Sequence, residues 1–100
     1  MELLKPLSDA SYPARSVAYT GTAGSTATWP AGPQGVVVWS DQACYVLVGE
    51  GVTATTASTP LPAFTPVPIA VLQGSGGAWR VSAIQVSTGG TIYCKPINAA

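Results

Sequence analysis

The chain of 100 residues contains no histidine, and only 8% of its residues are charged. Ordinary soluble domains carry charge at roughly 25% of their positions. Without histidine, the usual general base of catalysis and the commonest metal ligand are both missing. The carboxylates show no pairing that suits acid–base catalysis; they are Glu2, Asp9, Asp41 and Glu50. The sequence therefore predicts a protein that is not an enzyme and that holds no metal ion or other cofactor.

Runs of positive charge and membrane-spanning segments are also missing. The four basic residues are scattered along the chain: Lys5, Arg15, Arg80 and Lys95. A nucleic-acid surface needs clustered basic residues, so we expect no nucleic-acid partner. Residues 51–79 carry no charge, but four prolines within them exclude a membrane-spanning helix. The N-terminus lacks the long apolar core of a secretory signal, and we expect a chain that is made in a cytoplasm and kept as made.

Only two cysteines are present, Cys44 and Cys94, and each lies in a strand-like run. We expect both to be small buried hydrophobic residues with free thiols. A disulfide is the alternative, and it would require the two strands to face each other at close range. Two cysteines without histidine do not suit a zinc site.

Strand signals are abundant, whereas the spacing of apolar residues typical of helices is nearly absent. Short β-branched and aromatic runs separated by Gly, Pro, Ser and Thr predict strands near residues 16–20, 25–29, 36–39, 44–48, 52–56, 68–72, 78–87 and 91–97. The expected fold is all-β. It is a small Greek-key or jelly-roll-like β-sandwich or barrel of about seven or eight short strands. Residues 1–15 are predicted to form an extended N-terminal arm, and residues 16–100 a single β domain.

Two pairs of these runs are expected to form β-hairpins. Runs 36–39 and 44–48 flank a polar tip in which Asp41 suits a turn residue. Runs 78–87 and 91–97 flank a short loop with two glycines. In the run 78–87, the apolar positions change from one face of the strand to the other near Ala83. This change indicates a bulge or burial on both faces, and burial on both faces would suit an oligomer.

Prolines recur at even positions in the middle of the chain: Pro60, Pro62, Pro66 and Pro68. Residues two apart in an extended chain direct their N–H groups to the same side, and proline has no N–H. One side of this segment therefore lacks donors for a neighbouring strand. The spacing predicts an edge strand, or a segment along a subunit boundary, that resists further strand addition.

Hydrophobic residues make up 47% of the chain, which is high for so small a domain with so little charge. We expect part of the apolar surface to be buried between identical subunits. Large aromatic residues and the prolines of the edge segment are the interface candidates: Trp29, Trp39, Phe64, Pro66, Pro68, Trp79 and Tyr93. The same aromatic residues could instead fill the core, or exposed ones could stack against sugars.

The last two thirds of the chain contain a series of short motifs: ACYV followed by Gly49, TAT at 53–55, LPA at 61–63 and SAIQVSTGGTIY at 82–93. In this series the chain resembles small virion-associated β proteins of tailed bacteriophages. The motifs are strands and turns and contain no catalytic signature. Residues 1–35 match the pattern less clearly.

The resemblance implies a structural subunit of a bacteriophage virion, with a head decoration or cement protein as the preferred role. Its expected partners are copies of itself, with a homotrimer favoured, and the major capsid protein or other virion proteins. The expected location is the capsid surface, after synthesis in the host cytoplasm. Two alternatives stay open. One is a tail, neck or connector component that forms rings, and the other is a carbohydrate-binding module that uses Trp29, Trp39 or Trp79.

Overall fold

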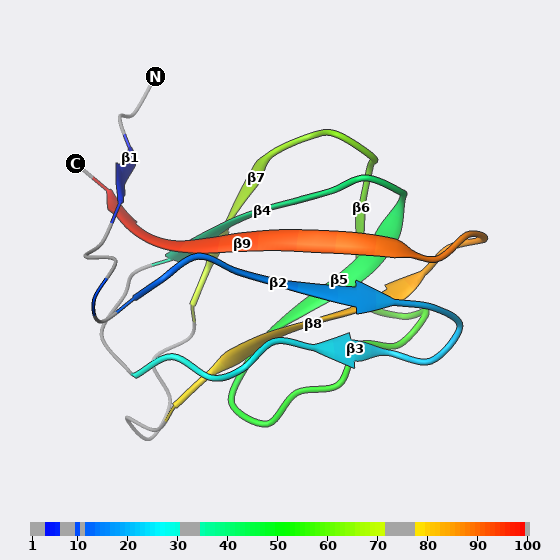
Figure 1. The fold of residues 1–100 in the computed structure, drawn as a ribbon, viewed down its shortest axis with the longest axis horizontal. Helices are drawn as coiled ribbons and strands as arrows, with labels where there is room; N and C mark the ends of the chain where they lie inside the picture. The colour runs from blue at the N-terminus through cyan, green and yellow to red at the C-terminus, as the bar shows by residue number, and fades with distance from the viewer. Residues whose placement is uncertain (1–3, 7–9, 11, 31–34, 72–77, 100) are drawn as a thin grey trace.

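The computed structural model describes residues 4–6, 10, 12–30, 35–71 and 78–99, and this part of the chain forms two packed antiparallel sheets (Figure 1). Sheet A contains β1 (Leu4–Pro6), β2 (Arg15–Tyr19), β4 (Gly35–Ser40), β7 (Val67–Ala70) and β9 (Gly90–Ala99). Sheet B contains β3 (Gly24–Ser25), β5 (Cys44–Gly49), β6 (Thr59–Leu61) and β8 (Arg80–Gln85). The all-β prediction is confirmed.

Four connections cross from one sheet to the other at the same end of the molecule. In Figure 1 those that follow β2, β4 and β8 are on the right, and the one that follows β6 arches over the top. They join β2 to β3, β4 to β5, β6 to β7 and β8 to β9. The order β2-β9-β4-β7 in sheet A matches the order β3-β8-β5-β6 in sheet B, so each crossing joins strands at matching positions. Eight antiparallel strands connected in this way form a jelly roll. The ninth strand, β1, pairs with the far end of β9, beyond β2.

Both expected hairpins are wrong, because each of these connections crosses between the sheets. Strand β4 pairs with β9 and β7, whereas β5 pairs with β8 and β6. The tips bind one another instead of closing hairpins. Asp41 accepts a hydrogen bond at Oδ1 from the Thr91 N–H at 2.8 Å, and Val86 N–H donates to Ala43 O at 3.4 Å. Asp41 is therefore a turn residue, as expected, but it ties two crossings together.

Residues 52–56 do not form the expected strand. They belong to the connection between β5 and β6, which runs across the outer face of sheet B. Ala54 is buried there, and its N–H donates to Ser82 Oγ at 2.8 Å. Arg80 Nε also donates to Val52 O at 3.0 Å. The expected burial of β8 on both faces is real at residues 81–83, but the chain's own segment supplies the cover.

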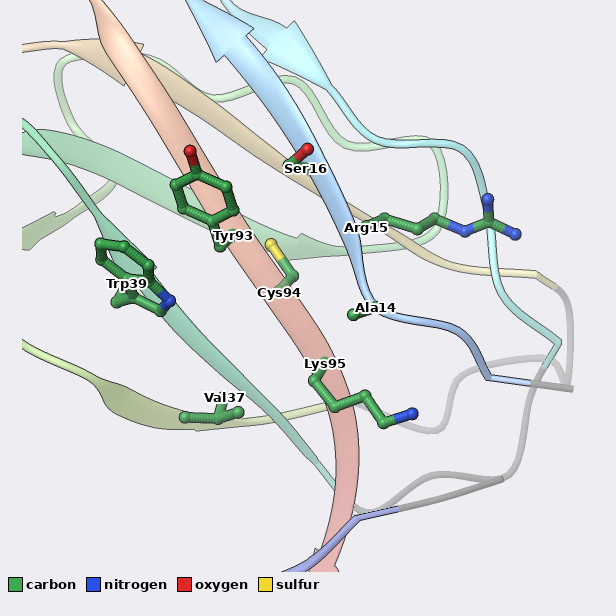
Figure 2. A pocket seen from close by; sticks show the side chains of 8 residues that line it. All are labelled: Ala14, Arg15, Ser16, Val37, Trp39, Tyr93, Cys94 and Lys95. Carbon is green, nitrogen blue, oxygen red and sulfur yellow. The ribbon is translucent and has the colours of Figure 1, made fainter. Parts of the chain in front are cut away.

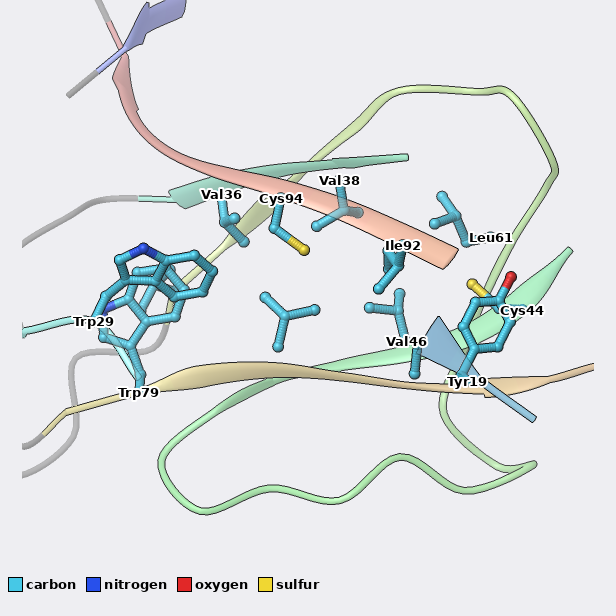
Figure 3. Packing of buried hydrophobic residues seen from close by; sticks show 13 residues of the cluster. Tyr19, Trp29, Val36, Val38, Cys44, Val46, Leu61, Trp79, Ile92 and Cys94 are labelled. Atoms are coloured by element: carbon cyan, nitrogen blue, oxygen red, sulfur yellow. The ribbon is translucent and has the colours of Figure 1, made fainter. Parts of the chain in front are cut away.

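Valine, isoleucine and cysteine side chains fill the space between the sheets (Figure 3). Trp29 and Trp79 close the end opposite the crossings, with ring centroids 4.7 Å apart. Their indole N–H groups donate to backbone carbonyls, Trp29 to Pro13 O at 2.8 Å and Trp79 to Pro30 O at 3.0 Å. Both side chains are buried. The prediction that Trp29 and Trp79 lie at a subunit interface is therefore wrong, because both pack inside the protein.

The predictions of free, buried cysteines and of prolines in an edge strand are confirmed. Cys44 and Cys94 are free and buried, in sheet B and sheet A respectively. The proline-rich segment supplies the edge strand of each sheet, β6 with Pro60 and β7 with Pro68. Of the expected N-terminal arm, Leu4–Pro6 belongs to sheet A, while residues 1–3, 7–9 and 11 lie outside the described residues.

Candidate functional site

The outer faces of the two sheets differ. Residues 50–58 cross the face of sheet B, whereas the face of sheet A carries exposed aromatic side chains. Trp39 on β4 and Tyr93 on β9 are 37% and 38% exposed, and Phe64, between β6 and β7, is 69% exposed. Trp39 lies directly opposite Tyr93 in the register of β4 and β9. The three side chains are neighbours, and we call them the aromatic ridge.

The rings of the ridge pack against one another. Trp39 and Tyr93 are stacked, with centroids 4.6 Å apart and an interplanar angle of 18°. Phe64 lies on the ridge at 6.4 Å from Trp39, tilted by 32°. Stacked aromatic pairs contribute about 0.5–1.5 kcal/mol beyond the area that they bury. The packing therefore holds the three rings in fixed positions although they face solvent.

Phe64 has an unusual backbone. Its φ of +56° lies in the left-handed region, which is rare for a bulky residue and costs roughly 1–2 kcal/mol. The Phe64 N–H donates to Ser40 O at 2.7 Å, which fixes the crossing against the end of β4. Backbone strain of this kind is concentrated at functional sites. The crossing thus holds a mostly exposed phenyl ring at a strained position beside the sheet.

Beside the ridge, sheet A has an open pocket of about 240 Å³, which we call the slot (Figure 2). It lies over the middle of β9, between two rows of outward side chains that are two residues apart along each strand. Trp39 and Tyr93 form the aromatic wall, and Val37 and Lys95 form the opposite wall. The remaining lining residues are Ala14, Arg15 and Ser16 of the β2 side and Cys94 of the floor.

The slot is apolar with a single cationic rim. Arg15 lines it, but its guanidinium lies 5.6 Å from the Trp29 ring centroid, on the core side. Lys95 Nζ donates to Tyr12 O at 2.9 Å. Among the described residues, no carboxylate lines the slot. Burial raises the pKa of the Cys94 thiol to about 12, so the sulfur is a neutral core atom and no nucleophile. The shape and the mainly apolar lining of the site suit a ring.

Five of the seven interface candidates lie on or beside this face. Trp39, Phe64 and Tyr93 form the ridge. Pro68 is opposite Val37 in the pairing of β7 with β4, and Pro66 is exposed in the crossing just before β7. The slot was missed from the sequence. Alternation along a strand puts Val37 beside Trp39 and Lys95 beside Tyr93. Only the pairing of β4 with β9 brings the two couples together.

No protein-family model, curated protein or solved structure matches the chain. Among the described residues, no group of three or more Cys, Asp or Glu side chains could hold a metal ion. The part of the chain that the structure describes contains no helix long and apolar enough to cross a membrane.

Proposed function

We propose that the chain is a structural subunit of a bacteriophage virion, a head decoration protein that binds a partner protein, either a second copy of itself or the major capsid protein, through the outer face of sheet A. The observation that carries the proposal is the aromatic ridge of Phe64, Trp39 and Tyr93. Jelly rolls occur in viral capsid proteins, but they also occur in lectins, so the architecture alone does not choose between the roles. The exposed rings of the ridge favour a contact surface for a protein partner.

The size of the ridge supports a contact surface. An aromatic side chain presents roughly 200 Å², so the exposed fractions leave about 300 Å² of ring surface in one patch. The largest apolar patch of a typical monomer is about 300–600 Å² and is often functional. Aromatic anchors at the centre of a patch carry much of the energy of protein–protein contacts. The ridge has this composition, and Pro66 and Pro68 extend it toward the edge of the sheet.

The ring geometry favours a protein partner over a sugar. Sugars stack on a free aromatic face, whereas the stacking of Trp39 with Tyr93 covers one face of each ring. Trp29 and Trp79 are buried, so Trp39 alone remains of the three tryptophans that could serve a carbohydrate-binding module. Protein contacts use ring edges and ring faces equally well. The exposure and stacking of these rings do not by themselves distinguish the head trimer that the sequence resemblance implies from a ring in the tail, neck or connector.

Immunoelectron microscopy tests the proposal directly. Antibodies against the chain should label the heads of particles of the phage that encodes it. Label confined to tails or necks would support the alternative structural role. Absence of the chain from peptide mass spectra of purified particles would refute a virion function.

A paired substitution tests whether the ridge is the contact. Trp39→Ala should abolish binding of purified protein to heads that lack it. Leu47→Ala, on the outer face of sheet B, should bind as wild type does. The two residues are exposed to the same fraction, 37%, so Leu47→Ala controls for truncation of a partly exposed apolar side chain. Equal binding by both variants would exclude the ridge.

A further inference from the structure

We propose that the slot is filled by Phe64 of a second copy of this chain. Two copies would meet with their A sheets face to face, and each would insert its Phe64 ring into the slot of the other. The inference rests on the proposed role of the ridge as a contact surface and names its occupant. It is carried by three observations: the volume of the slot, the strained exposure of Phe64, and the position of both on one face.

The slot has enough volume for a flat ring. An apolar cavity of about 150 Å³ is enough to bind benzene. The slot, at about 240 Å³, therefore accommodates a phenyl ring.

The chemistry of the slot suits an aromatic ring better than an ion or a polar group. Two of its lining residues are aromatic and two are aliphatic, and Lys95 contributes its methylene stem, whereas Arg15 and Ser16 are its other polar lining residues. The ammonium group of Lys95 lies at the rim, where it attracts the face of a ring within about 6 Å. Its hydrogen bond to Tyr12 O keeps it at this rim.

Phe64 is the side chain of this protein that is best prepared to be such an occupant. It is the most exposed of the large hydrophobic residues, at 69%. Its left-handed backbone and its N–H bond to Ser40 O hold the crossing that presents it. Little conformational freedom is therefore lost when the ring is captured, which favours association.

Phe64 and the slot lie on the same face of the protein, and this placement favours two-fold symmetry. Trp39 separates Phe64 from the slot, and both open toward the same side of sheet A. A self-complementary patch of this kind is satisfied twice by a two-fold axis. A closed ring of three copies would need Phe64 and the slot to face different directions. The ridge supplies about 300 Å² per copy, below the ~800 Å² per partner of standard interfaces, so we expect a weak dimer.

Sedimentation equilibrium over a concentration series tests the dimer with the full chain. Wild type should change from the 10.1 kDa monomer to twice that mass. Phe64→Asn removes the ring and keeps a residue that accepts a left-handed backbone, so it should weaken association by about tenfold or more without lowering Tm. Ser16→Leu adds a bulky side chain at the exposed slot lining and should weaken association equally. Leu47→Asn, on sheet B, is the matched control and should dimerise as wild type does.

A mixing experiment separates this arrangement from other contacts. In a mixture of Phe64→Asn and Ser16→Leu, the intact Phe64 of one variant meets the intact slot of the other. Native mass spectrometry should therefore show heterodimers at concentrations where neither variant dimerises alone. Absence of heterodimers, a Phe64→Asn protein that dimerises normally, or a wild type that stays monomeric throughout would overturn the inference. A Phe64-dependent trimer would overturn its two-fold form.

The outcomes are independent of the virion experiment. A monomer that still decorates heads would overturn this inference alone, with the capsid protein as the occupant of the slot. A slot-dependent dimer that is absent from particles would refute the proposed virion function alone.

Discussion

The hydrogen bond from the Thr91 N–H to Asp41 Oδ1 joins the β8–β9 crossing to the β4–β5 crossing. This bond gives the sharpest test of the fold that positions the ridge. A Cβ added at Gly90 would lie 2.5 Å from Asp41 Oδ1 and 2.9 Å from both Gln42 Cβ and the Tyr19 hydroxyl oxygen. Asp41 cannot keep its 2.8 Å hydrogen bond from the Thr91 N–H beside such a methyl group. Gly90→Ala should therefore cost at least this bond, about 1.5–3 kcal/mol for a charged acceptor.

A double-mutant cycle with Asp41→Ala measures the coupling. Asp41→Ala alone should cost about 1.5 kcal/mol, because the acceptor is only half-buried. In that background Gly90→Ala loses its shortest clash and has no bond left to break. The double variant should then be about 1–2 kcal/mol more stable than the sum of the single effects predicts. Urea unfolding followed by tryptophan fluorescence reports these free energies, since Trp29 and Trp79 are buried. Additivity within about 0.5 kcal/mol would refute this hydrogen-bonded link between the two crossings and would suit two separate hairpins.

Two further predictions concern buried polar groups near the same core. Burial raises the pKa of Cys94 from 9.0 to about 12, so the unfolded chain releases this proton at lower pH than the folded protein does. The contribution of the neutral Cys94 thiol to folding stability is fully present below about pH 9 and is lost as pH rises toward 12. At pH 10 the free energy of unfolding should have fallen by about 1.4 kcal/mol. Cys94→Val should show a smaller alkaline loss in urea unfolding, and an unchanged loss would contradict the linkage. Tyr19→Phe removes a buried hydroxyl that donates to Gln42 O at 2.7 Å and contacts Ser40 Oγ. It should cost about 1–2 kcal/mol by thermal unfolding, whereas the control Tyr45→Phe should stay within about 0.5 kcal/mol.

The strands could largely be predicted from the sequence because alternation and turn residues are local signals. The runs at 36–39 and 44–48 are found within β4 and β5, and 91–97 lies within β9. Residues 25–29 form a strand only at their first residue. Gly24 passes so close to Ala18 O that a Cβ there would lie at 2.3 Å. The chain then leaves the ladder, and Trp29 closes the core with an isolated bridge to Trp79.

The connections could not be predicted, because a polar tip serves a hairpin and a crossing equally well. The deciding fact is that β4 pairs with β9, more than 50 residues away, so that Trp39 faces Tyr93. Nothing within the run 36–48 encodes that partner. The same pairing decides the site. Sequence reasoning named Trp39 and Tyr93 as separate candidates, and it could not see that Val37 and Lys95 would complete a slot between them.

The high apolar content of the sequence predicts that part of the surface is buried between identical subunits. The structure accommodates this apolar content within a single chain. The accessible surface of the chain is 5289 Å², and a compact monomer of 10.1 kDa has about 5300 Å². Two of the three tryptophans lie in the core, and the chain's own segment covers sheet B. The proposed contact through the ridge is therefore not needed to complete the fold. Dilution well below the dimer Kd should halve the mass seen by light scattering and leave the far-ultraviolet circular dichroism unchanged. Loss of the β signal on dilution would mean that the protomer is completed only by its neighbour.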